Sequence, residues 1–182
     1  MIIFVGLAGS GKSTQGQLLA AHLHCPWIST GNLLREFNMD SAVQQRMLQG
    51  EIIDDETTLA VLERELERID AAHNECILDG TPRTLTQAEW LIKKVVSGEL
   101  KISGLIHLKA TTDTAKARLL ARHRPDDTEK AIAERFAEYE STVKPIIDYM
   151  KKSGITVFDI DADLQPEVIA TDIVQKLGLS SE

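Results

Sequence analysis

The sequence has few cysteines: Cys25 and Cys76 are the only two among its 182 residues. They lack the spacing of a metal-binding set. Each lies beside an apolar run, which favours two buried small side chains over a disulfide bond. This cysteine usage fits a protein of the reducing cytoplasm, and we therefore expect a cytoplasmic location.

Long apolar runs and an excess of positive charge are also missing. No run approaches the ~18 apolar residues that a membrane span needs. The apolar residues 1–5 have no basic segment before them, which argues against a signal peptide. The net charge of −8 argues against nucleic acid or an acidic membrane as a partner. One local exception is a positive cluster formed by Arg118, Arg122, Arg124 and Arg135.

Short apolar runs alternate with longer helical patterns along the chain. The runs occupy residues 2–5, 27–29, 76–78, 105–108 and 156–160, and the helical patterns occupy residues 12–23, 57–69, 126–152 and 166–177. Each run is short and bounded by Gly, Pro, Asp or Ser, as in strands buried on both faces. The alternation predicts one α/β domain, a five-stranded parallel sheet with helices on both faces. We expect Pro145 to kink or split the third helix and Gly178 to end the last one.

A glycine-rich segment directly follows the first predicted strand. Residues 6–13 read Gly-Leu-Ala-Gly-Ser-Gly-Lys-Ser, which matches the P-loop pattern, and they lead into the helix expected at 12–23. Glycines let successive N–H groups turn toward a phosphate, and the helix N-terminus adds partial positive charge. Lys12 could then reach the β- and γ-phosphates, Ser13 could ligate Mg²⁺, and Thr14 could bond the α-phosphate. The alternative is a turn that only caps a helix, and the strand-loop-helix context disfavours it.

Three further segments carry arginine, carboxylate or amide side chains: residues 28–35, 50–55 and 78–87. Arg35 and Arg83 can fork onto a monophosphate. Asp79 ends an apolar strand beside the P-loop, where a carboxylate can hold Mg²⁺ through water. Gln87 offers a donor and an acceptor that suit the exocyclic amine and the adjacent ring nitrogen of adenine. The alternatives are a solvated helix arginine for Arg35, a turn or cap residue for Asp79, and a surface helix residue for Gln87.

With the P-loop and the arginine cluster, these segments resemble the adenylate kinase family in order and spacing, from residue 2 to about residue 170. The resemblance implies a P-loop kinase fold and reversible, Mg²⁺-dependent phosphoryl transfer from ATP to AMP, giving two ADP. It also implies one domain over residues 1–182. The expected core comprises residues 1–29, 61–117 and 128–182, with a monophosphate-binding segment at 30–60 and a short lid at 118–127.

The resemblance implies overlapping sets of site residues. The ATP site would comprise Gly9, Ser10, Gly11, Lys12, Ser13, Thr14, Arg118 and Arg122, with Arg118 against the adenine. The AMP site would comprise Thr30, Gly31, Arg35, Ile53, Gly80, Arg83, Gln87, Arg124 and Arg135. The catalytic residues would be Lys12, Arg83, Arg122, Arg124 and Arg135. Mg²⁺ would be held, largely through water, by Ser13 and Asp79. In the resembled family, Thr and Gln at the positions of Thr30 and Gln87 accompany AMP.

The loop between Arg122 and Asp126 is very short. Some members of the resembled family carry here a lid of about thirty residues with a cysteine-zinc site, and this chain has neither the length nor the cysteines. We therefore expect no zinc and a small lid that closes through its arginines. Asp126 with Glu129 matches a capping box, which would start the next helix at Asp126. A solvated basic face is the alternative interpretation of the arginine cluster.

Four positions depart from what is usual in the resembled family: Ala8 stands for Pro, Ser13 for Gly, Asn32 for Asp and Thr81 for Phe. Asn32 loses a charge near the expected magnesium site, and Thr81 removes an aromatic wall beside the acceptor. Two other functions therefore stay open. One is a UMP/CMP or broad-specificity nucleoside monophosphate kinase, and the other is a nucleotide-sensing P-loop protein without turnover. We expect a monomer whose partners are the small molecules ATP, AMP and ADP.

Overall fold

Five parallel strands form the centre of the computed structural model, which describes residues 1–37, 45, 53–125 and 127–179. The strands are β1 (Ile2–Gly6), β2 (Trp27–Ser29), β3 (Ile77–Asp79), β4 (Gly104–Lys109) and β5 (Val157–Asp161). Their order in the sheet is β2-β3-β1-β4-β5, so β1 is central and pairs with β3 and β4. The predicted α/β fold with a five-stranded parallel sheet is confirmed, with strand boundaries shifted by at most one residue.

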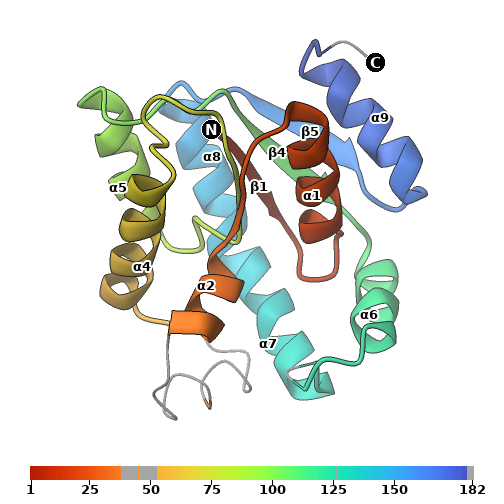
Figure 1. Cartoon of the computed structure of the whole chain (residues 1–182). Helices are drawn as coiled ribbons and strands as arrows, with labels where there is room; N and C mark the ends of the chain where they lie inside the picture. Colours follow the sequence, from red (N-terminus) through yellow and green to blue (C-terminus); the bar gives the residue numbers. More distant parts are fainter. Residues whose placement is uncertain (38–44, 46–52, 126, 180–182) are drawn as a thin grey trace.

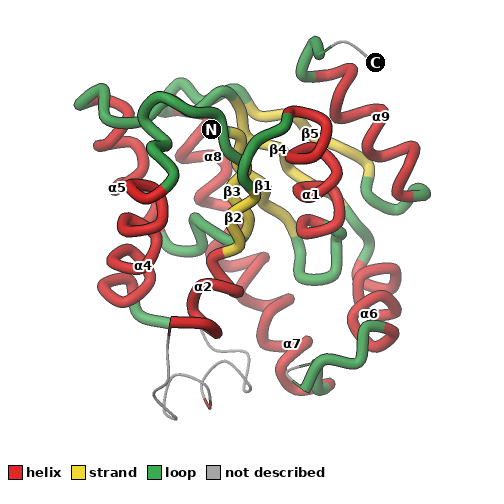
Figure 2. Tube along the Cα trace, viewed as in Figure 1, coloured by secondary structure: helices red, strands yellow, loops and turns green. Residues whose placement is uncertain are grey.

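Helices cover both faces of this sheet (Figures 1 and 2). They are α1 (Lys12–Leu23), α2 (Thr30–Phe37), α4 (Asp55–Arg68), α5 (Leu85–Val96), α6 (Thr112–Ala121), α7 (Glu129–Glu138), α8 (Lys144–Lys152) and α9 (Pro166–Lys176). Alternate residues of each strand point to opposite faces. Ile3 of β1 therefore joins a core with α4, α5 and α8, whereas Phe4 joins a core with α1 and α9.

Local side-chain caps fix where several helices begin. Asp54 accepts a hydrogen bond from the Thr57 N–H at 2.8 Å and starts α4 two residues before the expected position. Thr84 accepts from the Gln87 N–H at 3.2 Å and starts α5. Gly178 has a φ of 68° just beyond α9, which confirms its expected role at the end of that helix.

The predicted helix over residues 126–152 is divided as expected, but its start was wrong. The helix begins at Glu129 because Thr128 provides the cap, accepting from the Ala131 N–H at 3.2 Å. Asp126, the expected start, lies outside the described residues. A π-helical turn, η1 (Tyr139–Val143), separates α7 from α8 just before Pro145. Proline has no N–H to donate and clashes with the preceding turn, and a widened turn relieves that clash.

The carboxyl ends of the strands all point to one edge of the sheet, where α2, α6 and α7 lie (Figure 1). The Tyr139 hydroxyl, in η1, is hydrogen-bonded to His107 Nε2 of β4 at 2.7 Å. This bond fixes the position of the end of α7 relative to the sheet. The side chains of α7 that lie over the carboxyl edge are therefore held in place. Among the described residues, the helices are too short or too polar to traverse a bilayer.

Candidate active site

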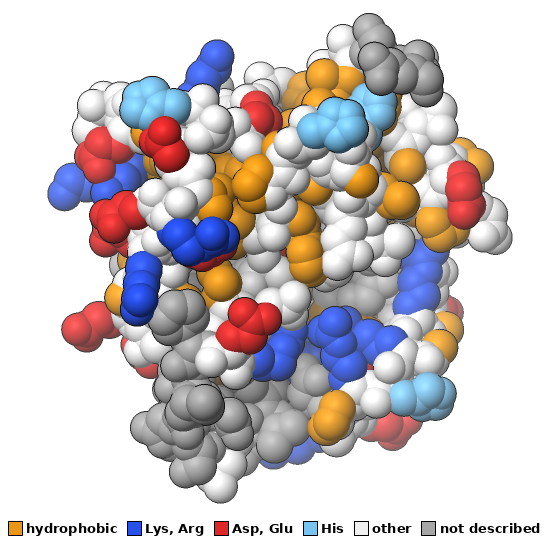
Figure 3. Space-filling model, viewed as in Figure 1, with side chains coloured by type: hydrophobic (Ala, Val, Ile, Leu, Met, Phe, Trp, Pro, Cys, Tyr) orange, Lys and Arg blue, Asp and Glu red, His pale blue; other side chains and the backbone are white. Residues whose placement is uncertain are grey.

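A cleft of about 390 Å³ opens at the carboxyl edge of the sheet. Its wall contains residues from the P-loop, α2, the turn after β3, α6 and the segment after α6. All the predicted site residues except Ser10 line it. Ser10 is fully buried within the loop, and its hydroxyl has no hydrogen-bond partner among the described residues. Figure 3 shows Lys and Arg side chains gathered in a hollow on this face of the otherwise acidic protein.

Two glycines illustrate why the backbone of the P-loop requires this residue. Gly9 has a φ of +83°, and a Cβ atom there would lie 2.3 Å from the Ala115 carbonyl oxygen of α6. Gly11 has a φ of 97° and occupies the N-cap position of α1, where a left-handed conformation turns the chain into the helix. The loop therefore places the N-terminus of α1, with its partial positive charge, at the cleft.

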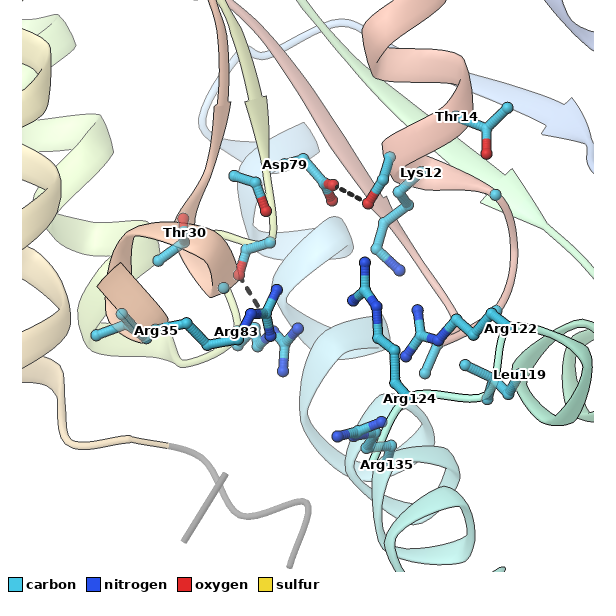
Figure 4. Close-up of a pocket in the computed structure, with 18 of the residues that line it drawn as sticks. Lys12, Thr14, Thr30, Arg35, Asp79, Arg83, Leu119, Arg122, Arg124 and Arg135 are labelled. Carbon is cyan, nitrogen blue, oxygen red and sulfur yellow. Dashed lines mark hydrogen bonds between the residues drawn. The ribbon is translucent and has the colours of Figure 1, made fainter. Parts of the chain in front are cut away.

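Lys12, the first residue of α1, reaches the centre of the cleft (Figure 4). Its Nζ donates to the carbonyl oxygens of Gly6 at 2.8 Å and Leu7 at 2.9 Å. Burial lowers the pKa of Lys12 to about 8, while the nearby Asp79 carboxylate opposes the shift and Arg83 adds to it. The ammonium group is thus held by its own loop, next to the helix N-terminus that favours anions.

Two oxygen-bearing side chains meet beside Lys12 where β3 ends. Ser13 Oγ donates to Asp79 Oδ2 at 2.7 Å, and Asp79 is only 4% exposed. A hydroxyl and a carboxylate are hard oxygen ligands of the kind that Mg²⁺ prefers, and two of them leave most coordination positions to water and phosphate. The described residues contain no group of three His, Cys, Asp or Glu side chains able to hold a metal ion by themselves. The pair therefore fits a nucleotide-bound Mg²⁺ ion.

Five arginines extend into the cleft from opposite sides (Figure 4). Arg35 comes from α2 and Arg83 from the turn before α5, whereas Arg122, Arg124 and Arg135 come from the end of α6, the following loop and α7. The Arg83 Nε donates to the Gly80 carbonyl oxygen at 3.1 Å, and its guanidinium lies beside that of Arg35 (Figure 4). Guanidinium groups that approach a common space from two sides can bind two phosphate groups end to end.

A carboxylate that the sequence did not reveal positions two of the cleft arginines. Asp127 accepts two hydrogen bonds from Arg122, one of them from Nη2 at 2.7 Å, and a third from Arg135 Nη1 at 3.1 Å. Burial alone would raise the pKa of Asp127, but the hydrogen bond and charge of Arg122, together with Arg135, lower it below the usual value. The expected capping role of Asp126 is therefore replaced by Thr128 as cap and by Asp127 as the arginine partner.

Glu138, at the end of α7, is a second unforeseen carboxylate. Its Oε1 lies 4.0 Å from Arg83 Nη1, and its side chain is largely buried. Burial raises the pKa of Glu138 above the ordinary value, although the charges of Arg83, Lys12 and Arg135 oppose the rise. Glu138 thus places negative charge behind the cations of the cleft.

Arg118, in α6, also lines the cleft. Its Nη1 donates to the Ala162 carbonyl oxygen at 2.7 Å and its Nη2 to the Leu164 carbonyl oxygen at 3.2 Å. These two bonds hold the planar guanidinium against the segment after β5. A flat, fixed guanidinium suits stacking on an aromatic base, as expected for the ATP side.

The expected acceptor side contains Thr30, Ile53 and Gln87, all buried and all lining the cleft. Thr30 Oγ1 is hydrogen-bonded to Thr81 Oγ1 at 2.9 Å. Thr81 therefore fixes the Thr30 hydroxyl instead of forming a wall, as an aromatic side chain would. Asn32 Oδ1 accepts from Arg35 Nη2 at 2.6 Å, so the Asn32 amide orients an arginine. Gly50, Glu51 and Ile52 of the predicted segment 50–55 lie outside the described residues.

Several residues in or around the cleft were not among the predicted site residues. Asp127, Glu138 and Asp55 contact predicted arginines or Gln87, and Leu34, Thr58 and Leu119 complete the lining. The doublet Asp126-Asp127 inside the arginine cluster could have suggested an ion pair, whereas the others have spacings that only the fold brings to the site.

Comparison with known proteins agrees with this geometry. A family model described as adenylate kinase matches residues 4–155. The protein named "Adenylate kinase 1" of Nostoc sp. (strain PCC 7120 / SAG 25.82 / UTEX 2576) is 37% identical over 185 aligned residues, which cover 97% of this chain and 98% of the relative. An "Adenylate kinase" of Rhodopirellula baltica (strain DSM 10527 / NCIMB 13988 / SH1) is 34% identical over 98% of this chain and 95% of the relative. Another, of Corynebacterium urealyticum (strain ATCC 43042 / DSM 7109), is 34% identical over 93% of this chain and 94% of the relative.

Proposed function

The chain belongs to the adenylate kinase family, and from this premise we propose that its cleft transfers a phosphoryl group from ATP to AMP, reversibly, to give two ADP. The observation that carries the proposal is the convergence of Lys12 with arginines from two opposite sides of one cleft (Figure 4). A protein that only bound ATP would need the P-loop side alone. The second set, with Arg35 and Arg83, supports a second phosphate-bearing ligand.

Phosphoryl transfer between nucleotides depends on positioning and charge neutralisation. The attacking group is a phosphate oxygen of AMP, which is already anionic, so no side chain has to remove a proton. Lys12 and the P-loop N–H groups would hold the phosphates of ATP, and Arg35 and Arg83 would hold the phosphate of AMP. Arg122, Arg124 and Arg135 would face the group in transit and stabilise the charge that develops on its oxygens.

Magnesium fits the pair formed by Ser13 and Asp79, and its chemistry there would be to neutralise phosphate charge. The residues themselves would orient the ion: Asp79 is fixed at the end of β3, and Ser13 is fixed in the first turn of α1. We also propose that the chain needs no zinc, acts as a monomer and works in the cytoplasm. The short segment between α6 and α7 leaves no room for a zinc-binding lid, and the free Cys25 and Cys76 fit a reducing cytoplasm.

Water would compete with AMP for the phosphoryl group in an open cleft. We therefore expect closure of the segment 30–60 and of the lid 118–127 over both nucleotides, and hydrolysis of ATP without AMP at less than about 1% of the transfer rate. ADP formation from Mg-ATP, measured with AMP, UMP, CMP, GMP and dAMP and with no acceptor, tests this. AMP should be the best acceptor. A fast ATPase without acceptor, or tight ATP binding with no ADP formed, would contradict the proposal.

The pKa of Lys12 gives the cleft a pH dependence with a defined sign. Its ammonium loses the proton as pH rises through about 8 in the free protein, whereas bound phosphate needs the charged form. Binding above pH 8 therefore requires proton uptake, and ATP affinity should fall by up to about 10-fold per pH unit. Calorimetric titration between pH 7 and 9.5 in two buffers of different ionisation enthalpy measures both effects. Lys12→Arg, which stays charged, should show no such fall, and constant affinity in the unmodified protein would reject the assignment.

A further inference from the structure

The side-chain amide of Gln87 is held on two sides by the protein. Gln87 is 1% exposed and lies in the first turn of α5, where it lines the cleft. Its Oε1 accepts from the Arg83 backbone N–H at 2.8 Å, and its Nε2 donates to Asp55 Oδ1 at 2.9 Å. The same Asp55 oxygen accepts from the Thr84 hydroxyl at 2.7 Å, which fixes the carboxylate in turn.

The chemistry of these partners decides which end of the amide is oxygen. A backbone N–H can only donate, so the atom facing Arg83 N has to be Oε1. A carboxylate can only accept, so the atom facing Asp55 has to be Nε2. Turning the amide by 180° would place two donors together at Arg83 and two acceptors together at Asp55. Each mismatch leaves buried polar groups unpaired, and the turned state is therefore strongly disfavoured.

Each held atom keeps one unused hydrogen-bonding position. A primary amide has two N–H donors and two oxygen lone pairs, and the protein uses one of each on Gln87. What remains is one acceptor beside one donor, in a fixed order. Adenine offers a donor at its 6-amino group and an acceptor at N1. Hypoxanthine and guanine offer the reverse, an acceptor at O6 and a donor at N1.

We propose that Asp55 and the Arg83 backbone N–H lock the Gln87 amide in the orientation that pairs with a 6-aminopurine and mismatches a 6-oxopurine. Asp55 is then a positioning residue for base selection, acting through Gln87. The proposal rests on the proposed function, because it assumes that Gln87 faces the acceptor base. It assigns the selection among purines to an aspartate in α4 that does not itself line the cleft.

An acceptor series on the unmodified protein tests the lock without any mutation. Purine riboside monophosphate lacks the 6-amino group but keeps N1, so it loses one hydrogen bond. Inosine monophosphate would place its O6 acceptor against the Gln87 oxygen and its N1–H donor against the Gln87 nitrogen. We expect kcat/KM to fall by about 10- to 100-fold from AMP to purine riboside monophosphate, and by at least about 10-fold more to inosine monophosphate. If the amide could turn, inosine monophosphate would instead exceed purine riboside monophosphate.

Asp55→Asn supplies the second measurement, with Asp54→Asn as its matched control. An asparagine at 55 can donate or accept, so Gln87 can turn with one mismatch in place of two. The ratio of kcat/KM for inosine monophosphate to that for AMP should rise by at least about 10-fold, through KM, while kcat with AMP stays within about 3-fold. Asp54→Asn removes a neighbouring carboxylate, the cap of α4, and should leave the ratio unchanged.

The outcomes separate the two proposals. If the unmodified protein does not phosphorylate AMP, the proposed function fails and the lock fails with it. If AMP is phosphorylated but inosine monophosphate is a better acceptor than purine riboside monophosphate, the lock alone is wrong. An equal change of the ratio in both asparagine variants would also overturn it, because the effect would then follow charge and not contact with Gln87. The predicted order of acceptors, with a change only in Asp55→Asn, supports it.

Discussion

Replacing Lys12 with methionine lowers kcat for ADP formation by at least about 100-fold, the loss expected when an electrostatic stabiliser of the transition state is removed. Methionine has a similar length and no charge, so the variant keeps the packing of the first turn of α1 and loses the ammonium group. The Nζ atom of Lys12 also holds the carbonyl oxygens of Gly6 and Leu7, and these would be left to water. Both effects act at the cleft, where β1 ends and the P-loop begins.

Steady-state kinetics with Mg-ATP and AMP measures this loss, and circular dichroism and thermal unfolding check that the variant is folded. Lys152→Met is a suitable control, because Lys152 is exposed at the end of α8 and outside the cleft lining. The control should keep its rate within about 2-fold. If Lys12→Met kept a near-normal kcat, Lys12 would have no part in stabilising the transferred group.

Arg83→Ala should also lower kcat by at least about 100-fold. Arg83 lies on the same side of the cleft as Arg35, held by the Gly80 carbonyl oxygen and close to Glu138. Truncation removes a bidentate phosphate donor and leaves the buried Glu138 without one of its nearby positive charges. The fall in kcat, measured with both nucleotides, should therefore be larger than the fall in affinity for ATP alone.

Comparison of kcat with the affinity for ATP and for AMP separates these effects. Arg68→Ala is the matched control, since Arg68 is exposed at the end of α4 and pairs with Glu65 outside the cleft. It should keep its rate within about 2-fold. A normal rate in Arg83→Ala, with AMP bound as before, would assign the phosphate contacts to the other arginines and reject the role given to Arg83.

The parts of the site that follow from the sequence are those fixed by local chain geometry. The P-loop is a strand, a glycine turn and a helix start within one short segment, so its shape follows from its own residues. Asp79 was predictable in the same way, because it is the last residue of an apolar strand beside β1. The close spacing of Arg122, Arg124 and Arg135 also indicated that they share a site, since only a short loop connects α6 to α7.

The parts that could not be predicted depend on contacts between segments far apart in the chain. Asp55 meets Gln87 across 32 positions, and Thr30 meets Thr81 across 51. Neither spacing carries a periodic signal. The start of α7 was misplaced for a related reason: Asp126 and Asp127 both suit a helix cap, and only the position of Arg122 shows that Asp127 is used as an ion-pair partner.

Arg135 differs from the other cleft arginines in the helix on which it lies. Its helix α7 continues through η1 into α8, whose Ile146 and Met150 are buried in the core, and its own side chain is only 11% exposed. The conformational freedom of this side chain is thus lost when the chain folds, before any nucleotide arrives. A phosphate that binds Arg135 meets a preorganised cation, so the entropic cost of ordering this contact is not subtracted from the affinity.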